Sequence, residues 1–255
     1  MHSLFVLIPC YNEAENIGDL IENWILQREE ILKNGYELKI YAIDDCSTDN
    51  TKDVIISKRD KYPECVALIK HDVNKNLCGG LNTSISFFTT HGSNGDLMCI
   101  MDGDNTQSPA YIHQMLDKIT CDELDCVIAS RYRKGSDVIG LAGYRKFMSD
   151  MARFYYTMVL HIPGIRDYTC GYRLYRFEKI CDVRERFGDE PIKESSFACM
   201  MELLYKIYIT GAKFGEVGFK LRYDQKRGYS KMNVRNTMMK SVSVAWKLKI
   251  NKGRI

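Results

Sequence analysis

The sequence lacks several features that define specialised classes of protein. No stretch approaches the ~20 consecutive apolar residues that a membrane-spanning helix needs. At the start of the chain, the apolar residues Leu4 to Ile8 run directly into Pro9 and a polar loop, so we expect no signal peptide. The chain also contains no internal repeat and no low-complexity segment. These absences favour an ordinary globular domain over a membrane-spanning, secreted or repetitive protein.

Charge and cysteine usage exclude two further classes. The net charge of +3 is too small to indicate a nucleic-acid partner. The ten cysteines include no Cys-x-x-Cys pair of the kind that binds zinc. Several stand in apolar runs, where a thiol behaves as a small buried hydrophobic group: Cys65, Cys99, Cys126 and Cys199. We therefore expect free thiols in a reducing cytosol. The 255 residues can fill one large domain, or one domain plus an appendage.

What the sequence does contain is a buried strand that ends on two carboxylates. Leu97 to Met101 is a short apolar run, and Asp102 and Asp104 follow it with only a glycine between them. Two such carboxylates repel each other unless a cation lies between them, and hard oxygen ligands suit Mg²⁺ or Mn²⁺. Because these ions also bind substrate phosphates, we interpret the pair as a metal site that holds a diphosphate. The alternative is a pair of ordinary loop carboxylates, since a lone Asp-x-Asp is common.

Strands and helices alternate around this run, which indicates an α/β fold with a mostly parallel sheet and flanking helices. Further strands are predicted over residues 4–8, 39–43, 65–69 and 126–129, and helices over about 17–32, 81–88 and 109–119. In such sheets, ligands bind at the carboxyl ends of the strands. We expect four polar loops to meet there: 9–13, 44–51, 79–80 and 102–107. Asn12 is predicted to cap the first helix, and Gly80 to lie in a turn that brings backbone close to a ligand.

Three motifs in this half of the chain carry a family resemblance. They are Ile-Pro-Cys-Tyr-Asn-Glu (8–13), Ile-Asp-Asp-Cys-Ser-Thr-Asp-Asn-Thr (43–51) and Met-Asp-Gly-Asp (101–104). In this order and spacing they resemble the inverting nucleotide-sugar glycosyltransferases of family 2, which have the Rossmann-like GT-A fold. The resemblance of this half covers Val6 to about Arg131.

The resemblance implies roles for residues of each motif. It implies that Pro9, Tyr11 and Glu13 contact the nucleotide, and that Asp45 contacts the base or the ribose. It implies that Asp102 and Asp104 hold the metal on the diphosphate of the sugar donor. A packing role for Tyr11 and a helix-dipole role for Glu13 remain open. Asp44 and Asp49 are expected to cap turns, as short carboxylates do.

The second half narrows the resemblance to the polyprenol-phosphate glycosyltransferases, the group that includes dolichol-phosphate mannosyltransferase. Three runs carry it, 130–132, 166–173 and 227–231, and they extend it to about Asn233. A lipid monophosphate acceptor needs positive charge beside the metal. Arg131 and Arg173 can offer planar guanidinium groups to phosphate oxygens, and Lys231 a point charge. These cations can also be surface charges or structural ion pairs.

Two positions depart from the pattern of the family. A glutamine often stands four residues after the first metal aspartate, whereas here that position holds Thr106 and Gln107 follows it. The third metal ligand therefore stays open. An arginine often stands three residues before the glycine of the last motif, and here that position holds Gln225. Either Lys226 and Arg227 rebuild the contact with the acceptor phosphate, or the acceptor differs.

Two segments, 144–160 and 234–255, interleave apolar and basic residues, as helices in a membrane interface do. For the first segment, packing on the protein or on another subunit remains equally open. For the second, we expect contact with anionic lipid. We divide the chain into a GT-A domain, 1–233, and a basic amphipathic segment, 234–255. We expect peripheral association with the cytoplasmic face of a membrane, with an integral membrane partner or a homo-oligomer as further possibilities.

The sequence thus predicts an inverting, metal-dependent enzyme that moves a sugar from a UDP- or GDP-linked donor to a polyprenyl phosphate. The residues predicted to be catalytic are Asp104, Arg131 and Arg173. One alternative acceptor is a saccharide hydroxyl, which would need a base such as Glu194 or Glu202. For both glutamates, however, we favour a helix-surface or ion-paired role. Another alternative is a nucleotide-sugar-binding module without catalysis, against which the intact aspartate pair argues.

Overall fold

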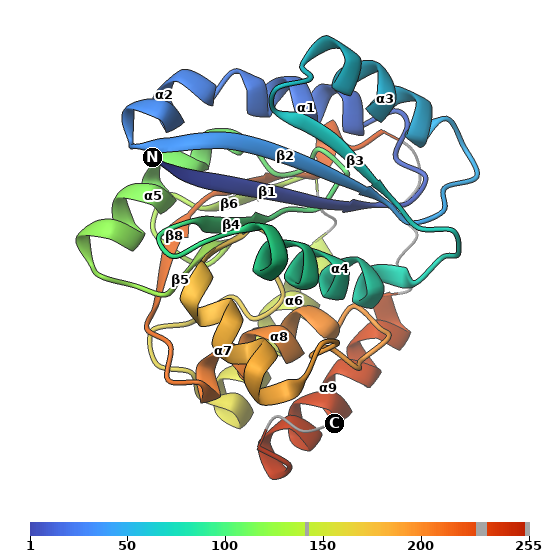
Figure 1. Cartoon of the computed structure of the whole chain (residues 1–255). Coiled ribbons are helices and arrows are strands. Elements are labelled where there is room, and N and C mark those ends of the chain that lie inside the picture. The colour runs from blue at the N-terminus through green and yellow to red at the C-terminus, as the bar shows by residue number, and fades with distance from the viewer. Residues whose placement is uncertain (141–142, 228–233, 253–255) are drawn as a thin grey trace.

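The structure, a computed structural model, describes residues 1–140, 143–227 and 234–252 (Figure 1). Within these residues, one sheet has seven strands in the order β3-β2-β1-β4-β7-β5-β8. Neighbouring strands are parallel except at β7, which runs antiparallel to β4 and to β5. The strands are β1 (His2–Cys10), β2 (Tyr36–Asp44), β3 (Val66–Lys70), β4 (Leu97–Ile100), β5 (Cys126–Ser130), β7 (Arg173–Arg176) and β8 (Phe214–Gly218). The predicted α/β fold with a mostly parallel sheet is confirmed.

Helices cover both faces of this sheet (Figure 1). On one face lie α1 (Ile17–Ile25), α2 (Arg28–Lys33) and α3 (Thr51–Lys61). On the other lie α4 (Asn76–His91), α7 (Phe177–Phe187) and α8 (Cys199–Ile209). A short 3-10 helix, η1 (Pro109–Tyr111), leads into α5 (Ile112–Cys121), which contacts β5 and β8.

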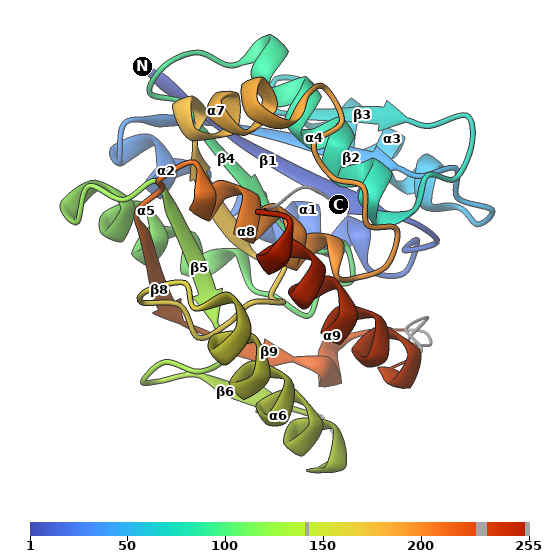
Figure 2. The same ribbon diagram turned by 90° about the horizontal axis from the view of Figure 1, so that it is seen from below.

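A smaller unit adjoins the carboxyl ends of β5 and β8. Its two parallel strands are β6 (Asp137–Ile139) and β9 (Lys220–Arg222), and a second 3-10 helix, η2 (Tyr223–Gln225), follows β9. Next to it lie α6 (Gly143–Leu160) and α9 (Val234–Ile250), which contact each other, and α9 also contacts α8 (Figure 2). Within the described part of the chain, no helix is both long enough and apolar enough to cross a membrane.

The place of the aspartate pair follows from the composition of the central strands. In β1, the residues from Leu4 to Ile8 are all buried, and β4 is buried along its whole length. Continuous apolar runs of this kind suit parallel strands that are covered on both faces. Because β4 lies beside β1 in the middle of the sheet, Asp102 and Asp104 leave the core at the centre of the carboxyl edge.

Two predictions around glycine and asparagine are wrong. The helix α4 begins at Asn76, so Gly80 lies inside a helix and not in a turn that faces a ligand. A Cβ atom at Gly80 would come within 2.8 Å of Pro9 Cβ, so the absent side chain allows α4 to pack on β1. Asn12 does not cap the first helix either, because α1 begins only after Asn16. Asn12 instead has a left-handed backbone, with φ of 54°.

Other boundaries shift without changing the fold. The helix predicted over 17–32 is interrupted between α1 and α2. The strand β7 was not predicted at all. All ten cysteines lie in the described residues and are free, as expected. The described part of α9 packs on the domain, with Val244 and Leu248 buried, and the predicted boundary at residue 233 stays a prediction.

Candidate active site

The loop after β1 is joined to the loop after β2. The Asn12 backbone N–H donates to Ser47 Oγ (2.9 Å), and the Asn12 side-chain oxygen accepts from the backbone N–H of Thr48 (2.8 Å). Tyr11, which is 36% exposed, and Glu13 flank this residue. The structure therefore brings two of the residues predicted to meet the nucleotide to the carboxyl end of β1, on a loop held by its neighbour.

Asp45 lies at the end of β2 and is almost completely buried. Its Oδ1 accepts a hydrogen bond from the backbone N–H of Lys75 (2.8 Å) and lies 2.7 Å from His71 Nδ1. Asp45 thereby holds the segment before α4, and its predicted contact with the base or ribose stays a prediction. Asp44 and Asp49 accept hydrogen bonds from backbone N–H groups of their own loop, which confirms their predicted capping role.

The two aspartates after β4 come together at the centre of the edge. Asp102 Oδ2 accepts from Gln107 Nε2 (2.8 Å). Asp104 Oδ1 accepts from Thr106 Oγ1 (2.7 Å), and Asp104 Oδ2 accepts from Lys226 Nζ (2.8 Å). Burial and the neighbouring Asp104 carboxylate raise the pKa of Asp102 to about 6. Each carboxylate thus disfavours ionisation of the other, and a bound cation would reduce the repulsion between them.

The surrounding oxygen atoms fit a hard divalent cation. Gln107 is 4% exposed, and its Oε1 is buried without a hydrogen-bond partner in the described structure. Thr106, by contrast, donates both its hydroxyl and its backbone N–H to Asp104. Of these two residues, Gln107 is therefore the one whose side-chain oxygen has no hydrogen-bond partner in the described structure. In the described residues, no cluster of three His, Cys, Asp or Glu side chains could hold a metal, so a cation at this pair would need amide, water or phosphate oxygens as well.

The backbone at Gly171 leaves room for the first aspartate. A Cβ atom at this position would lie 2.7 Å from both carboxylate oxygens of Asp102. In the sequence, Gly171 lies inside the run 166–173, and no role was predicted for it. The position of Gly171 against the carboxylate depends on β7, which begins two residues later and pairs with β4 and β5.

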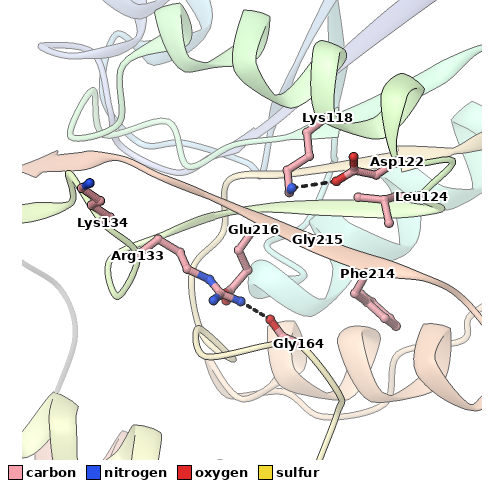
Figure 3. A pocket seen from close by; sticks show the side chains of 9 residues that line it. All are labelled: Lys118, Asp122, Leu124, Arg133, Lys134, Gly164, Phe214, Gly215 and Glu216. Atoms are coloured by element: carbon pink, nitrogen blue, oxygen red, sulfur yellow. Dashed lines mark hydrogen bonds and ion pairs between the residues drawn. The ribbon is translucent and has the colours of Figure 1, made fainter.

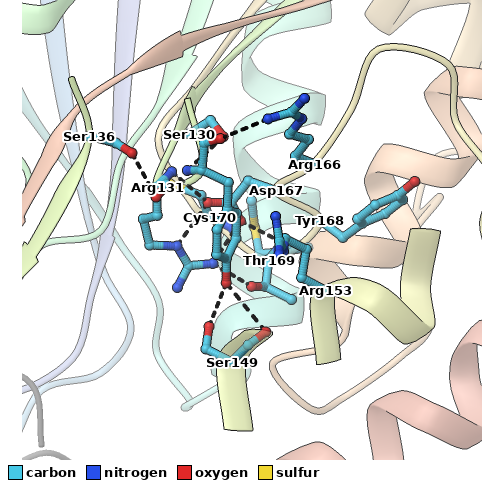
Figure 4. Close-up of polar contacts among 12 residues, drawn as sticks. Ser130, Arg131, Ser136, Ser149, Arg153, Arg166, Asp167, Tyr168, Thr169 and Cys170 are labelled. Carbon is cyan, nitrogen blue, oxygen red and sulfur yellow. Dashed lines mark hydrogen bonds and ion pairs between the residues drawn. The ribbon is translucent and has the colours of Figure 1, made fainter. Parts of the chain in front are cut away.

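Arg131 follows β5 and is held in an ion pair (Figure 4). Its Nε donates to Asp167 Oδ2 (2.8 Å), and its Nη2 donates to Asp167 Oδ1 (2.6 Å) and to Thr169 Oγ1 (2.7 Å). Burial acts to raise the pKa of Asp167, but the charge and hydrogen bonds of Arg131 outweigh it, so that this pKa is lowered. The structural ion pair considered for Arg131 is therefore present, and its contact with a substrate phosphate stays a prediction.

The prediction for Arg173 needs correction. Arg173 lies in β7 and is completely buried. Its guanidinium donates to the backbone oxygens of Met200 (2.6 Å) and Tyr168 (2.9 Å). Its charge is close enough to lower the pKa of Asp102, against the larger effect of burial. With no exposed surface, Arg173 cannot contact a substrate phosphate in this structure, and its effect on the site is electrostatic.

The segment after β9 supplies a cation, Lys226, for which the sequence predicted only a possible contact with the acceptor phosphate. Lys226 reaches Asp104, whereas Arg227 is exposed and its Nη1 lies 3.2 Å from Asp19 Oδ2 at α1. Lys231, predicted to contact the acceptor phosphate, lies outside the described residues. The only sequence signal for Lys226 was its position beside Gln225, where the family pattern has an arginine.

The two glutamates that could serve as a base are used within the protein. Glu202 is completely buried, forms an ion pair with Lys206, and accepts hydrogen bonds from the backbone N–H groups of Lys193 and Glu194. The ion-paired role that we favoured for Glu202 is confirmed. Glu194 Oε1 accepts from the backbone N–H of Ser196 (2.9 Å).

A cavity of about 410 Å³ lies apart from the aspartates, beside the outer strand β8 (Figure 3). Four of its charged groups form ion pairs: Lys118 pairs with Asp122 (2.8 Å), and Arg133 pairs with Glu216 (2.6 Å). It contains none of the predicted site residues. The cavity therefore gives no reason to move the candidate site away from the carboxyl edge.

A mostly parallel α/β sheet with an Asp-x-Asp pair at the end of a central strand is the arrangement expected of nucleotide-sugar-dependent glycosyltransferases with the GT-A fold. Comparison with known families agrees with this class. The family model described as "Glycosyl transferase family 2" matches residues 5–183, and the chain belongs to that family.

Curated relatives fall in the polyprenol-phosphate group. A dolichol-phosphate mannosyltransferase of Pyrococcus furiosus is 30% identical over 202 residues, which are 79% of this chain and 52% of that protein. A polyprenol monophosphomannose synthase of Mycolicibacterium smegmatis is 25% identical over 238 residues, which are 92% of this chain and 84% of that protein. The match thus spans about half the length of the Pyrococcus furiosus relative.

Solved structures share the fold at low sequence identity. Glucosyl-3-phosphoglycerate synthase of Mycobacterium tuberculosis, in a complex with Mn²⁺ and UDP, has a TM-score of 0.68 and 14% identity, and the match covers 97% of this chain and 80% of that one. Mannosyl-3-phosphoglycerate synthase of Rubrobacter xylanophilus has a TM-score of 0.67 and 16% identity, and the match covers 100% and 76%. These likenesses establish the GT-A fold.

Proposed function

We propose that the chain transfers one sugar from a UDP- or GDP-linked donor to a polyprenyl phosphate, with inversion at the anomeric carbon. The observation that carries the proposal is the pair Asp102 and Asp104 at the end of β4, held beside Lys226 and Gln107. The names of the two curated relatives support the class of acceptor. The donor would lie over the carboxyl ends of β1 and β2, against Pro9, Tyr11, Glu13 and Asp45.

The metal would be Mg²⁺ or Mn²⁺, held by Asp102, Asp104 and the side-chain oxygen of Gln107. When bound, it would supply positive charge against the negative charge that grows on the leaving diphosphate. The protein would supply the rest by position. The acceptor phosphate oxygen would attack from the face opposite the diphosphate, held there by Arg131, Arg227 and Lys231. Because a phosphate is already ionised, no base is needed, in agreement with the internal ion pair of Glu202.

The acceptor is tested by nucleotide release from purified protein with Mg²⁺ or Mn²⁺. UDP- and GDP-sugars are screened alone, with a short-chain polyprenyl phosphate, and with the corresponding polyprenol that lacks the phosphate. We expect release that requires the polyprenyl phosphate and is not supported by the alcohol. Release that ignores both lipids would keep the donor site and direct the search to saccharide hydroxyls. Donor binding without transfer or slow hydrolysis would favour a module without catalysis.

The membrane surface is the partner that we propose for the outer faces of α6 and α9. On α6, Met151, Phe154 and Met158 are each more than half exposed and share one helix face at spacings of three and four. On α9, Trp246 and Ile250 are also more than half exposed, and they are four residues apart. They lie next to the exposed Lys247 and Lys249. Apolar side chains beside basic ones suit the cytoplasmic face of an anionic membrane, with or without an integral partner or a second copy.

Vesicle sedimentation tests this contact. We expect the protein to pellet with vesicles that contain phosphatidylglycerol and to remain in solution with pure phosphatidylcholine. The double variant Phe154→Ser/Trp246→Ser should bind at least about ten-fold more weakly, because two large apolar groups no longer enter the interface. The matched control is Val73→Ser, which removes an exposed apolar side chain from the segment before α4. Equal binding of all three proteins would contradict the assignment of α6 and α9.

A further inference from the structure

The segment from the end of β9 to Arg227 crosses the carboxyl edge and is fixed by its backbone. The backbone N–H of Arg222 donates to the backbone oxygen of Thr106 (2.9 Å), next to the aspartate pair. At the other end, the side-chain amide of Asn16 accepts from the backbone N–H of Arg227 and donates to its backbone oxygen, both at 3.1 Å. Because Asn16 is buried, these two bonds form a firm attachment to the start of α1. Lys226 thus extends from a backbone that is held on both sides.

Both oxygens of Asp104 are already engaged. Oδ1 accepts from the hydroxyl of Thr106, and Oδ2 accepts from the ammonium of Lys226 at 2.8 Å. The side chains of Lys226 and Asp104 are only 18% and 16% exposed, so water competes little for this bond. A divalent cation would need an oxygen of Asp104, and it would be repelled by an ammonium in the same place. The metal and Lys226 are therefore alternative partners of one carboxylate oxygen.

We propose that Lys226 is a positioning residue that occupies Asp104 until the metal arrives and then turns to a phosphate oxygen of the bound substrate. This inference rests on the proposed function for the nature of the substrate. The flexible four-carbon stem of lysine allows the ammonium to move while Asn16 holds the backbone. Displaced from Asp104, the ammonium is left beside a site that binds phosphate groups. Metal binding and phosphate recognition are in this way coupled through one side chain.

The first test measures Mn²⁺ binding by electron paramagnetic resonance without nucleotide. We expect Lys226→Met to bind Mn²⁺ about ten-fold or more tightly than the wild type, because Asp104 Oδ2 is freed from a charged hydrogen bond. The matched control is Lys33→Met, which removes another lysine–carboxylate pair, with Glu30 on α2. Unchanged or weaker binding by Lys226→Met would overturn the proposal.

The second test separates the exchange from a general effect of charge. UDP binding is measured by calorimetry in the presence of a chelator, with Asp104→Asn and Asp102→Asn as a matched pair that removes one negative charge each. Only Asp104→Asn releases Lys226, so we expect it to bind UDP several-fold more tightly than Asp102→Asn does. Adding Lys226→Met to Asp104→Asn should abolish this difference. The same comparison is made with a short-chain polyprenyl phosphate in place of UDP. If Asp104→Asn and Asp102→Asn bind each of these two ligands with equal affinity, the proposal is contradicted.

The same variants show whether Lys226 turns to a phosphate of the donor or of the acceptor. If the gain is seen with UDP, Lys226 turns to the donor diphosphate, and if it is seen with the short-chain polyprenyl phosphate, it turns to the acceptor. None of these measurements requires turnover. A protein that shows the exchange but transfers no sugar would refute the proposed function alone, and a protein that transfers sugar without the exchange would refute only this inference.

Discussion

Asp104→Asn is expected to lower turnover by roughly a thousand-fold or more, because in the proposed mechanism it removes the charged oxygen that would hold the metal against the leaving diphosphate. The amide oxygen can still accept the hydrogen bonds that Thr106 donates, so the loop should keep its shape. The loss should therefore appear in kcat and in Mn²⁺ affinity, whereas the melting temperature should stay close to that of the wild type.

The control for this variant is Asp117→Asn on the exposed face of α5, which changes charge by the same amount away from the site. It should behave as the wild type in turnover and in metal binding. Turnover of Asp104→Asn at near-normal rates would refute the assignment of the metal to this pair. If Asp104→Asn bound Mn²⁺ with normal affinity but showed no turnover, the proposed metal site would stand. Asp104 would then have a role other than holding the ion.

The sheet and its carboxyl edge could be predicted because local composition decides them. Leu4 to Ile8 and Leu97 to Ile100 are short continuous apolar runs, as is typical of parallel strands covered on both faces. The two aspartates follow the second run directly, so their place at the centre of the edge depended only on the order of the strands. The loop roles of Asp44 and Asp49 were predictable for the same reason, since their partners are a few residues away.

What could not be predicted depends on contacts between distant segments. Arg173 stands in a motif that suggests a phosphate contact, but β7 inserts antiparallel between β4 and β5 and buries it completely. Gly80 looked like a turn residue because glycine favours turns, whereas packing of α4 against Pro9 decides its role. Lys226 and Asp104 are separated by 122 residues, and no local pattern indicates that they meet.

Gly171→Ala is the second variant expected to have a large effect, although it adds a single methyl group. The new Cβ would lie 2.7 Å from both oxygens of Asp102, which is closer than atoms in van der Waals contact can approach. The backbone cannot easily retreat. Cys170 donates its N–H to Asp167 Oδ1 (3.0 Å), and Tyr172 bonds through its backbone oxygen to the N–H of Ala129 (3.0 Å). The carboxylate of Asp102 must therefore move.

If Asp102 holds the metal as proposed, its displacement should lower kcat/KM by about a hundred-fold, the order of loss that follows a misplacement of about 1 Å at a reacting centre. Mn²⁺ affinity should fall as well. Stability should change little, because the carboxylate can rotate away without leaving a cavity.

Gly215→Ala provides the opposite control, since its Cβ would meet the buried side chain of Leu124 at 2.4 Å, far from the aspartates. That variant should lose stability and keep its metal affinity. If Gly171→Ala lost stability in the same way while retaining Mn²⁺ affinity, Gly171 would serve the packing of β7 and not the position of Asp102.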